Sequence, residues 1–419
     1  MSEIVNLTNQ VKAQLPTELI AFMQLAGEVA HRSGKSLYLV GGVVRDLLLE
    51  RSNLDLDLVT EGDAIGLAHE LAGIREGKVV THPSFGTAGL RWDKWSVDIA
   101  TARLETYTRP GALPKVKPNF IKGDLFRRDF TINAMAVALA PDHYGELIDL
   151  YGGREDLERG FIRVLHEKSF VDDATRIWRG LRYEQRLCFQ LEPVTLELLK
   201  QSLSMLDTIS GERIRHELEL VLEEEFPEKV LCRAGELGVL AKVHSSLKGD
   251  NWLADKFARA RLAVPDASPV VPYLALLAYR LTEAEVERFI SYLRLPKSSA
   301  EVLRDTVDIK IRLELLDIPE LTSNGIYALL HGYVSPAITA NSLVTDSPVI
   351  KERIDLFLKK LRHIKPALSG GGLKRMGIAE GPRIKEILNM LRAARLDGKV
   401  CSRKDEEGLV EGWLAQEEV

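Results

Sequence analysis

Two aspartates separated by one residue, Asp55 and Asp57, are the side chains of this sequence best suited to chemistry. They alternate with leucines, and this period of two predicts a β-strand over Leu54–Thr60. Both carboxylates then leave the same face of the strand, roughly 7 Å apart. Carboxylate oxygens are ligands that Mg²⁺ prefers, so the pair can hold one or two ions against a triphosphate.

A strand, two glycines and a short helix come just before this pair. The apolar run Leu37–Val40 predicts the strand, Gly41 and Gly42 follow it, and Val43–Leu49 has the pattern of a helix. Glycine at such a junction lets backbone N–H groups approach a phosphate, and the start of a helix favours its negative charge. Arg45 adds a guanidinium fork that fits phosphate oxygens. Gly42 and Arg45 are therefore candidate ligands of a triphosphate.

Each of these signals has an ordinary alternative when it is taken alone. A Gly-Gly pair is usually only a turn, D-x-D is common by chance, and a helical arginine usually forms a surface salt bridge. The two motifs in this order, G-G-x-V-R-D at 41–46 and D-x-D at 55–57, resemble the polymerase-β-like nucleotidyltransferases. Within that group the sequence resembles the class II tRNA nucleotidyltransferase and bacterial poly(A) polymerase family.

The stretch Leu125–Ala136 carries the most specific part of this resemblance. It is similar to the family block R-R-D-(F/L)-T-(I/V)-N-A almost letter for letter. The resemblance implies that Arg128 contacts the nucleotide, and that Asp129 and Asn133 orient this arginine and the sugar region. Asn133 is also compatible with a simple turn cap.

A third acidic residue on a neighbouring strand completes the metal site in related folds. Asp98 is the candidate, because it lies in the apolar-flanked strand segment Ser96–Ala100. An aspartate at the end of a strand without any metal role is the alternative. The predicted catalytic residues are therefore Asp55, Asp57 and Asp98, with Mg²⁺ held by the first two.

Base selection is predicted for the segment Phe170–Tyr183. On a helix, Asp173 and Arg176 are three residues apart and share a face, as do Arg176 and Arg179; an ordinary ion pair is the alternative. The segment resembles the family element E-D-x-x-R, which implies that the protein itself selects the incoming base. A carboxylate accepts from the amine of cytosine or adenine, and an arginine donates to the adjacent ring nitrogen. Uracil and guanine present a carbonyl there, which leaves a buried acceptor facing an acceptor.

The segment also departs from the family pattern. Asp172 stands where the family has glutamate, and Trp178 stands where it has leucine or methionine. The shorter carboxylate puts the switch from C to A addition in question more than nucleotidyl transfer. Arg179 and Arg182 match further arginines that contact the nucleotide or the primer phosphates in the family.

Two further blocks support these elements. Arg103–Pro114 occupies the place of the flexible loop that helps the family switch from C to A, although an inert loop fits equally well. Ser210–Glu217 matches the family block S-x-E-R-I-x-x-E, which implies that Glu212 and Arg213 brace the helix that selects the base.

The elements that must position these residues form an α+β head followed by helices. The resemblance implies a polymerase-β-like nucleotidyltransferase head with a mixed sheet at 1–165, a helical neck at 166–235, and an all-α body and tail at 236–419. Capping-box spacing predicts helix starts at Thr282 and Ser298, Ser369–Gly372 is read as a turn, and a last helix ends near Gly398. The predicted elements of the head are helices at Pro16–His31 and Asp63–Leu71 and further strands at Lys78–His82 and Ala88–Trp92.

Composition limits the partners of the chain. Its 419 residues are 45% hydrophobic, and a net charge of −5 argues against a protein that coats polyanions. The locally basic stretch Lys351–Arg395 is a candidate RNA surface, although a solvated helix face is the default explanation. No long apolar run or signal sequence is present, so no membrane association and a cytoplasmic location are expected. The three scattered cysteines are expected to be reduced thiols.

The function that the resemblance implies is Mg²⁺-dependent addition of CCA to the tRNA 3′ end from CTP and ATP, with release of pyrophosphate. The alternatives are an A-adding or CC-adding specialist, a poly(A) polymerase, and an RNA-binding protein with an inactive head. Poly(A) polymerases tend to carry a strongly basic C-terminal extension, whereas this sequence ends in acidic residues. The sequence makes no prediction of the oligomeric state.

Overall fold

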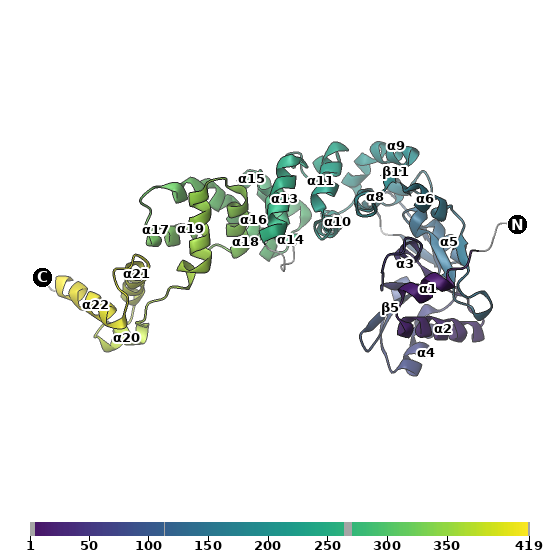
Figure 1. The fold of residues 1–419 in the computed structure, drawn as a ribbon, viewed down its shortest axis with the longest axis horizontal. Helices are drawn as coiled ribbons and strands as arrows, with labels where there is room; N and C mark the ends of the chain where they lie inside the picture. Colours follow the sequence, from purple (N-terminus) through teal and green to yellow (C-terminus); the bar gives the residue numbers. More distant parts are fainter. Residues whose placement is uncertain (1–4, 113, 264–269, 418–419) are drawn as a thin grey trace. The chain divides into compact units, whose positions relative to one another are not determined.

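A computed structural model of the protein describes residues 5–112, 114–263 and 270–417. The chain folds as two compact units, shown as a ribbon in Figure 1. The first unit comprises Met1–Glu224 and Arg233–Lys242, and the second comprises Glu225–Cys232 and Val243–Val419. The predicted head and the larger part of the predicted neck thus share one unit. The predicted boundaries between head, neck and body stay predictions.

A seven-stranded sheet in the order β3-β4-β5-β2-β1-β8-β9 forms the centre of the first unit. β2 and β5 are parallel, and the other neighbouring pairs are antiparallel. The predicted mixed sheet is therefore confirmed. The strands are β1 (Leu37–Val40), β2 (Leu56–Thr60), β3 (Lys78–His82), β4 (Thr87–Trp92), β5 (Trp95–Thr101), β8 (Met135–Ala138) and β9 (Leu147–Asp149).

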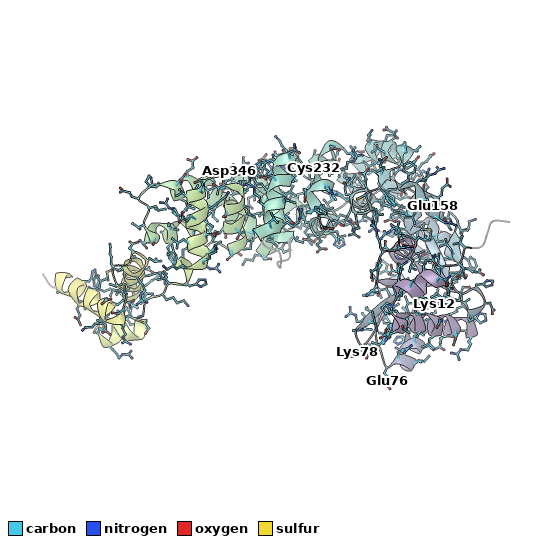
Figure 2. The ribbon with its side chains drawn as sticks, in the orientation of Figure 1. Lys12, Glu76, Lys78, Glu158, Cys232 and Asp346 are labelled. Atoms are coloured by element: carbon cyan, nitrogen blue, oxygen red, sulfur yellow. The ribbon has the colours of Figure 1, made fainter. Side chains whose placement is uncertain are left out.

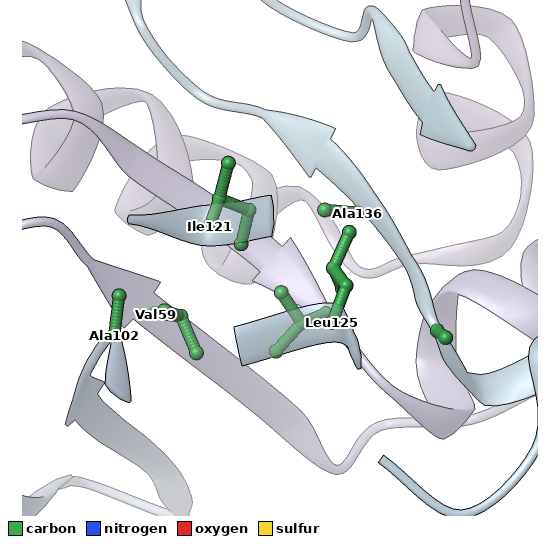
Figure 3. Close-up of a cluster of buried hydrophobic side chains, with 7 residues drawn as sticks. Val59, Ala102, Ile121, Leu125 and Ala136 are labelled. Atoms are coloured by element: carbon green, nitrogen blue, oxygen red, sulfur yellow. The ribbon is translucent and has the colours of Figure 1, made fainter. Parts of the chain in front are cut away.

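The two faces of this sheet differ because side chains alternate along each strand. One face packs against α2 (Thr17–Arg32) and α4 (Ala64–Arg75), and buries residues such as Leu58 and Ile99. On the other face, α5 (Ile121–Phe126) covers one part of the sheet and forms the apolar cluster of Figure 3. The remainder of this second face lines a cavity.

Some predicted elements were wrong at the level of single segments. β2 begins at Leu56, so Asp55 precedes the strand instead of belonging to it. The predicted loop Arg103–Pro114 contains a strand, because β6 (Arg103–Thr106) pairs with β7 (Lys115–Pro118) in a two-stranded antiparallel sheet. Leu113, in the same predicted loop, lies outside the described residues.

Helices make up most of the rest of the first unit. β10 (Phe161–Ile162) and β11 (Gln190–Leu191) form a two-residue parallel pair, and β11 interrupts the helical pattern that was predicted for the neck. The helices before and after it are α1 (Thr8–Gln14), α3 (Gly42–Leu48), α6 (Gly153–Arg159), α7 (Ser169–Asp172), α8 (Thr175–Leu187), α9 (Pro193–Gln201), α10 (Gly211–Leu222), α11 (Pro227–Glu236) and α12 (Val239–Val243), of which the last two cross the boundary between the units.

The described residues of the second unit form helices and short 3₁₀ turns. The capping box at Thr282 is confirmed, whereas Ser298 caps nothing because α16 already begins at Lys297 after Pro296. Asp346, labelled in Figure 2, accepts a hydrogen bond from Arg259 at 3.3 Å. Within the part of the chain that is described, no helix is long and apolar enough to cross a membrane. The helices are α13 (Asn251–Ala263), α14 (Val270–Ala278), α15 (Glu283–Leu293), α16 (Lys297–Arg312), α17 (Ser323–Leu330), α18 (Ser335–Val344), α19 (Pro348–Lys359), α20 (Gly370–Arg375), α21 (Pro382–Leu396) and α22 (Arg403–Glu417).

The last three helices share a small apolar core of their own. Two predictions fail here: Ser369 caps the start of α20 instead of marking a turn, and α22 follows the helix that was expected to be the last. Glu406 is fully buried, accepts hydrogen bonds from the N–H groups of Ala367 and Leu368, and pairs with Arg395 at 2.9 Å. This carboxylate therefore ties α22 to α21 and to the segment before α20.

Replacing Glu406 by alanine is expected to loosen this C-terminal core by about 2 kcal/mol, because buried N–H donors and a guanidinium lose their acceptor. Hydrogen exchange should show faster exchange in α20–α22 and unchanged exchange in the central sheet. Glu407→Ala is the matched control, since Glu407 is partly exposed and pairs with Arg403 on the surface. Equal protection in wild type and Glu406→Ala would contradict this role.

The basic stretch Lys351–Arg395 is only partly available to a ligand. Arg353 donates to the carbonyl groups of Leu316 and Ile318, and Arg392 donates to the hydroxyl of Tyr327. These contacts connect helices within the second unit. The RNA contact predicted for this stretch stays a prediction, with fewer available cations than the sequence suggests.

Candidate active site

A cavity of about 900 Å³ opens in the first unit, between the uncovered face of the sheet and α8. It brings together every predicted site residue except Arg182. Arg182 is buried outside the lining, 3.5 Å from Glu224. The predicted residues that line the cavity are Gly42, Arg45, Asp55, Asp57, Asp98, Arg128, Asp173, Arg176 and Arg179.

Three carboxylates meet on the sheet because β2 and β5 lie side by side. Asp57 is paired in register with Asp98 on the parallel neighbour, and Asp55 precedes β2 on the same side of the chain. Burial, the negative charge of Asp55 and that of Asp98 together raise the pKa of Asp57 to about 6, against the opposing charge of Arg128. A cluster of oxygen ligands whose mutual repulsion raises a pKa fits a divalent cation.

The described His, Cys, Asp and Glu side chains do not form a closed group of three around one point. Mg²⁺ differs from structural zinc in this respect, because it usually keeps several waters and takes one or two carboxylates together with substrate phosphates. Asp55 and Asp57 therefore fit Mg²⁺ as an open site. Asp98 is placed beside them on β5.

Gly41 lies between the carboxylate of Asp57 and the guanidinium of Arg128, and its lack of a side chain keeps the space between them open. Its φ of +82° is a conformation that L side chains rarely adopt. A Cβ there would also lie 3.2 Å from Nη1 of Arg128 and 3.3 Å from Oδ2 of Asp57. A side chain at position 41 would therefore strain the backbone and fill the gap between a cation and an anion.

Arg45 is buried and already engaged within the protein. Its guanidinium makes two hydrogen bonds of 2.8 Å to Asp46 and donates to Oδ1 of Asn133 at 2.9 Å. Asn133 thus positions Arg45, whereas the prediction that it orients Arg128 is wrong. Arg45 lines the cavity with a fixed orientation.

Asn53, which the sequence analysis did not single out, connects Arg45 to the metal side of the site. Its amide donates to Asp46 at 2.7 Å, and its carbonyl oxygen accepts from the backbone N–H of Asp55 at 2.9 Å. A chain of contacts therefore runs from Arg45 through Asp46 and Asn53 to Asp55. The N-x-D spacing of Asn53 and Asp55 was a signal for this Asx-type turn.

Asp129 holds Arg179, and not Arg128 as predicted. Oδ2 of Asp129 accepts from Nη2 of Arg179 at 2.6 Å and from Nε at 2.8 Å. Burial alone would raise the pKa of Asp129, but the Arg179 guanidinium, the Asn133 amide and the charge of Arg176 together outweigh it and lower the pKa to about 2. Arg128 instead pairs with the buried Asp124 at 2.9 Å. Asp124 and Tyr183 are the partners that the sequence analysis missed.

Tyr183 gathers the arginines of the site around one ring. The guanidinium carbons of Arg45 and Arg182 lie 5.3 Å from its centroid, and that of Arg179 lies 5.8 Å away. Cation–π attraction of this kind favours a fixed arrangement of the cations. Its i+4 spacing from Arg179 on α8 could have identified it from the sequence.

The helix that was predicted for base selection is interrupted at Asp173. α7 ends at Asp172 and α8 begins at Thr175, and Asp173 between them has an extended backbone. Asp173 therefore does not share a helix face with Arg176, and that prediction was wrong. Its carboxylate accepts from the backbone N–H and the hydroxyl of Thr175 and from Arg213 at 2.8 Å.

Arg176 is held by partners other than those of Asp173. Its guanidinium donates to the hydroxyl of Ser169 and to the main-chain oxygen of Arg127, each at 2.7 Å. Asp173 and Arg176 thus both line the cavity, each with its own support. Arg213 braces the first of them, as the neck block implied.

Asp172 and Trp178, the two departures from the family pattern, do not line this cavity. Trp178 is fully buried in the core. Asp172 lines a second cavity of about 540 Å³ with His166, whose ring nitrogen lies 3.9 Å from its carboxylate. Arg176 also lines this second cavity, so Asp172 shares a cavity with one of the two predicted base-reading residues.

Comparison with known proteins identifies the family of the chain. Residues 37–163 match the family described as poly A polymerase head domain, and residues 188–249 match the probable RNA and SrmB-binding site of polymerase A. The A-adding tRNA nucleotidyltransferase of Halalkalibacterium halodurans is 31% identical over 96% of this chain and 94% of its own length. The chain belongs to the tRNA nucleotidyltransferase and poly(A) polymerase family.

Other members of the family differ in length and in the name of their reaction. The A-adding tRNA nucleotidyltransferase of Geobacter sulfurreducens is 35% identical over 96% of this chain, but the chain spans only 48% of that protein. The CCA-adding enzyme of Leuconostoc citreum is 31% identical over 93% of this chain and 95% of its own length. A-adding and CCA-adding relatives are therefore both similar to the chain along most of its length.

Solved structures of CCA-adding enzymes share the fold. One in an apo form has a TM-score of 0.85 at 31% identity, covering 99% of this chain and all of the other. One with ATP has a TM-score of 0.83 at 30% identity over the same shares. A Thermotoga maritima CCA-adding enzyme in complex with tRNA has a TM-score of 0.79 at 30% identity, again with 99% of this chain covered.

Proposed function

We propose that this protein is a Mg²⁺-dependent tRNA nucleotidyltransferase that adds the terminal A to tRNA ending in CC. The observation that carries the proposal is the single cavity in which Asp55, Asp57 and Asp98 face Arg128 and Arg179. Relatives named A-adding and relatives named CCA-adding have this step in common. Full CCA addition, which the sequence analysis expected, is the second candidate, favoured by the likeness to CCA-adding enzymes solved with ATP and with CTP.

Nucleotidyl transfer forms a bond between the RNA 3′ oxygen and the α-phosphorus and breaks the bond to pyrophosphate, while the hydroxyl proton is lost to water. The protein contributes mainly positioning and charge stabilisation to such a step. Mg²⁺ held by Asp55 and Asp57 supplies part of that charge stabilisation. Arg128 lies on the other side of Gly41, where it can hold the triphosphate close to the carboxylates.

Protein-directed base selection is the second part of the proposal. The carboxylate of Asp173 is an acceptor for an exocyclic amine, and Arg176 supplies donors in the same cavity. Adenine and cytosine both carry an amine at that position, whereas guanine and uracil carry a carbonyl. Because both side chains are held by other protein groups, they are oriented before the base arrives.

The function is tested by incorporation of labelled ATP and CTP, separately and together, into tRNAs ending at the discriminator base, at C and at CC. ATP used on the CC-ended tRNA alone would establish the A-adding specialist. Addition of C, C and then A would establish the full enzyme and show that Asp172 permits the switch. Extension of unrelated RNA into long A tracts would indicate a poly(A) polymerase instead.

Asp173→Ala is expected to lower the preference for ATP over GTP by about 10- to 100-fold in kcat/KM, because one hydrogen bond of the reader is lost. The ratio is measured with CC-ended tRNA, so that a general loss of rate cancels. Arg213→Ala is the matched variant. It keeps the carboxylate of Asp173 but removes the hydrogen bond of 2.8 Å that braces it, so it should lower the preference for ATP over GTP by a smaller factor. An unchanged ATP-to-GTP ratio in Asp173→Ala would exclude Asp173 as a reader.

A further inference from the structure

The catalytic carboxylates lie in the middle of a row that crosses the sheet. Pairing registers place Val40, Asp57, Asp98, Gly89 and Val80 next to one another on β1, β2, β5, β4 and β3. Gly41 follows Val40, the last residue of β1, at one end of this row, and Nη1 of Arg128 lies next to it. Gly89 and Val80 extend it on the other side of Asp98, where the proposed function has so far assigned no substrate group.

The β3–β4–β5 end of this face is uncovered. Alternate residues of β3 are exposed, and the side chain of Val80 is 52% exposed although valine is usually buried. Arg91 on β4 and Ser96 on β5 are paired in register and are both exposed. Val80, Gly89, Arg91 and Ser96 all line the catalytic cavity, and we call them the β3–β5 shelf.

Arg91 differs from the other arginines of the cavity. Within the described residues, the guanidinium of Arg91 has no carboxylate or other hydrogen-bond partner. The other arginines of the lining each have one or more partners in the protein, namely Arg45, Arg127, Arg128, Arg176, Arg179 and Arg186. Arg91 is therefore the cavity cation with the most donors left for an anionic ligand.

Gly89 keeps the path from Asp98 to Val80 open. Its φ lies outside the range that requires glycine, so the backbone would accept another residue. A Cβ at this position would lie 3.1 Å from Oδ1 of Asp98. Any side chain there would crowd the carboxylate and stand between it and Val80. The lack of a side chain at Gly89 thus keeps the space next to Asp98 open.

We propose that the β3–β5 shelf receives the 3′-terminal nucleotide of the RNA, with Arg91 pairing with the phosphodiester on its 5′ side. This subsite rests on the proposed function. The attacking and leaving oxygens lie roughly in line during transfer, so the RNA must approach from the side opposite the pyrophosphate. With the triphosphate held at the Gly41 end, that side is the shelf. An arginine fork suits the phosphodiester, and Val80 offers an apolar contact to the sugar.

The test compares Arg91→Ala and Arg91→Glu with wild type on an acceptor-stem RNA ending in CC. Loss of a charge-assisted hydrogen bond should raise the KM for this RNA about 10-fold in Arg91→Ala, and more in Arg91→Glu. The Kd for ATP, measured by equilibrium dialysis without RNA, should not change. Arg75→Ala is the matched control, because Arg75 is exposed on α4, which packs on the opposite face of the sheet.

A chemically altered RNA identifies the phosphate concerned. A neutral methylphosphonate on the 5′ side of the terminal nucleotide should raise the KM of wild type. It should raise the KM of Arg91→Ala only slightly, because this variant has already lost the contact to that phosphate. Val80→Glu should also weaken RNA binding. Val194→Glu is the matched control and should behave as wild type, because Val194 is an exposed valine on α9 that does not line the cavity.

Two kinds of failure can be told apart. The subsite is wrong if wild type is active and the Arg91 variants keep its KM and its full methylphosphonate penalty. It is also wrong if the same variants weaken ATP binding as much as RNA binding, since Arg91 would then belong to the triphosphate site. A wild-type protein that transfers no nucleotide to any tRNA would instead reject the proposed function, and the subsite with it.

Discussion

Asp57→Asn is expected to reduce nucleotide incorporation by about a thousandfold, because it removes the carboxylate at the centre of the catalytic row. Asp57 is paired in register with Asp98, and Asp55 is the larger of its two sources of charge repulsion. Incorporation of labelled ATP into CC-ended tRNA measures the loss. Asp142→Asn, an exposed aspartate of the same unit, is the control and should keep wild-type turnover.

The same substitution is expected to stabilise the metal-free protein. The pKa of Asp57 is about 6 in the folded state against 3.8 for the ordinary group, so the folded chain holds this proton more tightly. Stability from this group is present below pH 4 and is lost as the pH rises to about 6. Asp57→Asn should recover about 1–3 kcal/mol in EDTA at neutral pH.

Thermal unfolding in EDTA across this pH range tests the sign. Wild type should lose stability between about pH 4 and pH 6 relative to Asp57→Asn, and added Mg²⁺ should stabilise wild type more than the variant. A variant that is both active and no more stable than wild type would contradict the metal-site assignment.

Asp129→Ala is expected to destabilise the first unit by about 3 kcal/mol, because it leaves Arg179 without the carboxylate that it pairs with at 2.6 Å. Asn133 also loses its acceptor, and with it the support of Arg45 weakens. The affinity for ATP should fall together with stability. Urea unfolding at neutral pH and equilibrium dialysis with ATP measure the two effects.

The pH dependence of stability separates Asp129 from an ordinary packing residue. Its pKa of about 2 lies below the ordinary value of 3.8, so its contribution is present above pH 4 and is lost as the pH falls towards 2. Asp129→Ala should lack this loss. Glu155→Ala is the control, since its pair with Arg159 is exposed and should contribute less than about 1 kcal/mol. Equal losses of stability in Asp129→Ala and Glu155→Ala would exclude the buried pair of Asp129 and Arg179 as a major contribution to the stability of the first unit.

The strands that carry the site could be predicted because they are half-buried. β1, β3 and β5 alternate or stay apolar between clear turn residues, and each was predicted within about one residue. β8 was missed because all four of its residues are buried, which leaves no alternation to detect. The β6–β7 pair was missed for the opposite reason, since an exposed ribbon such as Lys115–Pro118 has no apolar face.

The residues that make up the site were easier to predict than the contacts that they form with one another. Motif resemblance identified Asp129 and Arg179 separately, but their pairing spans 50 residues of sequence and depends on how α8 packs. Asp173 was misplaced because a helix was assumed to run through it. Its carboxylate instead bonds to the N–H and hydroxyl of Thr175, and this local bond competes with helix continuation.

The chain of contacts from Arg45 through Asp46 and Asn53 to Asp55 has a thermodynamic consequence. A triphosphate that binds at Arg45 and an ion that binds at Asp55 act on the two ends of one hydrogen-bonded unit. Linkage requires that if either ligand tightens the other, the effect is equal in both directions. If the triphosphate tightens Mg²⁺ binding, the Mg²⁺ affinity of the free protein is lower than that of the nucleotide complex, and Mg²⁺ raises the triphosphate affinity by the same factor.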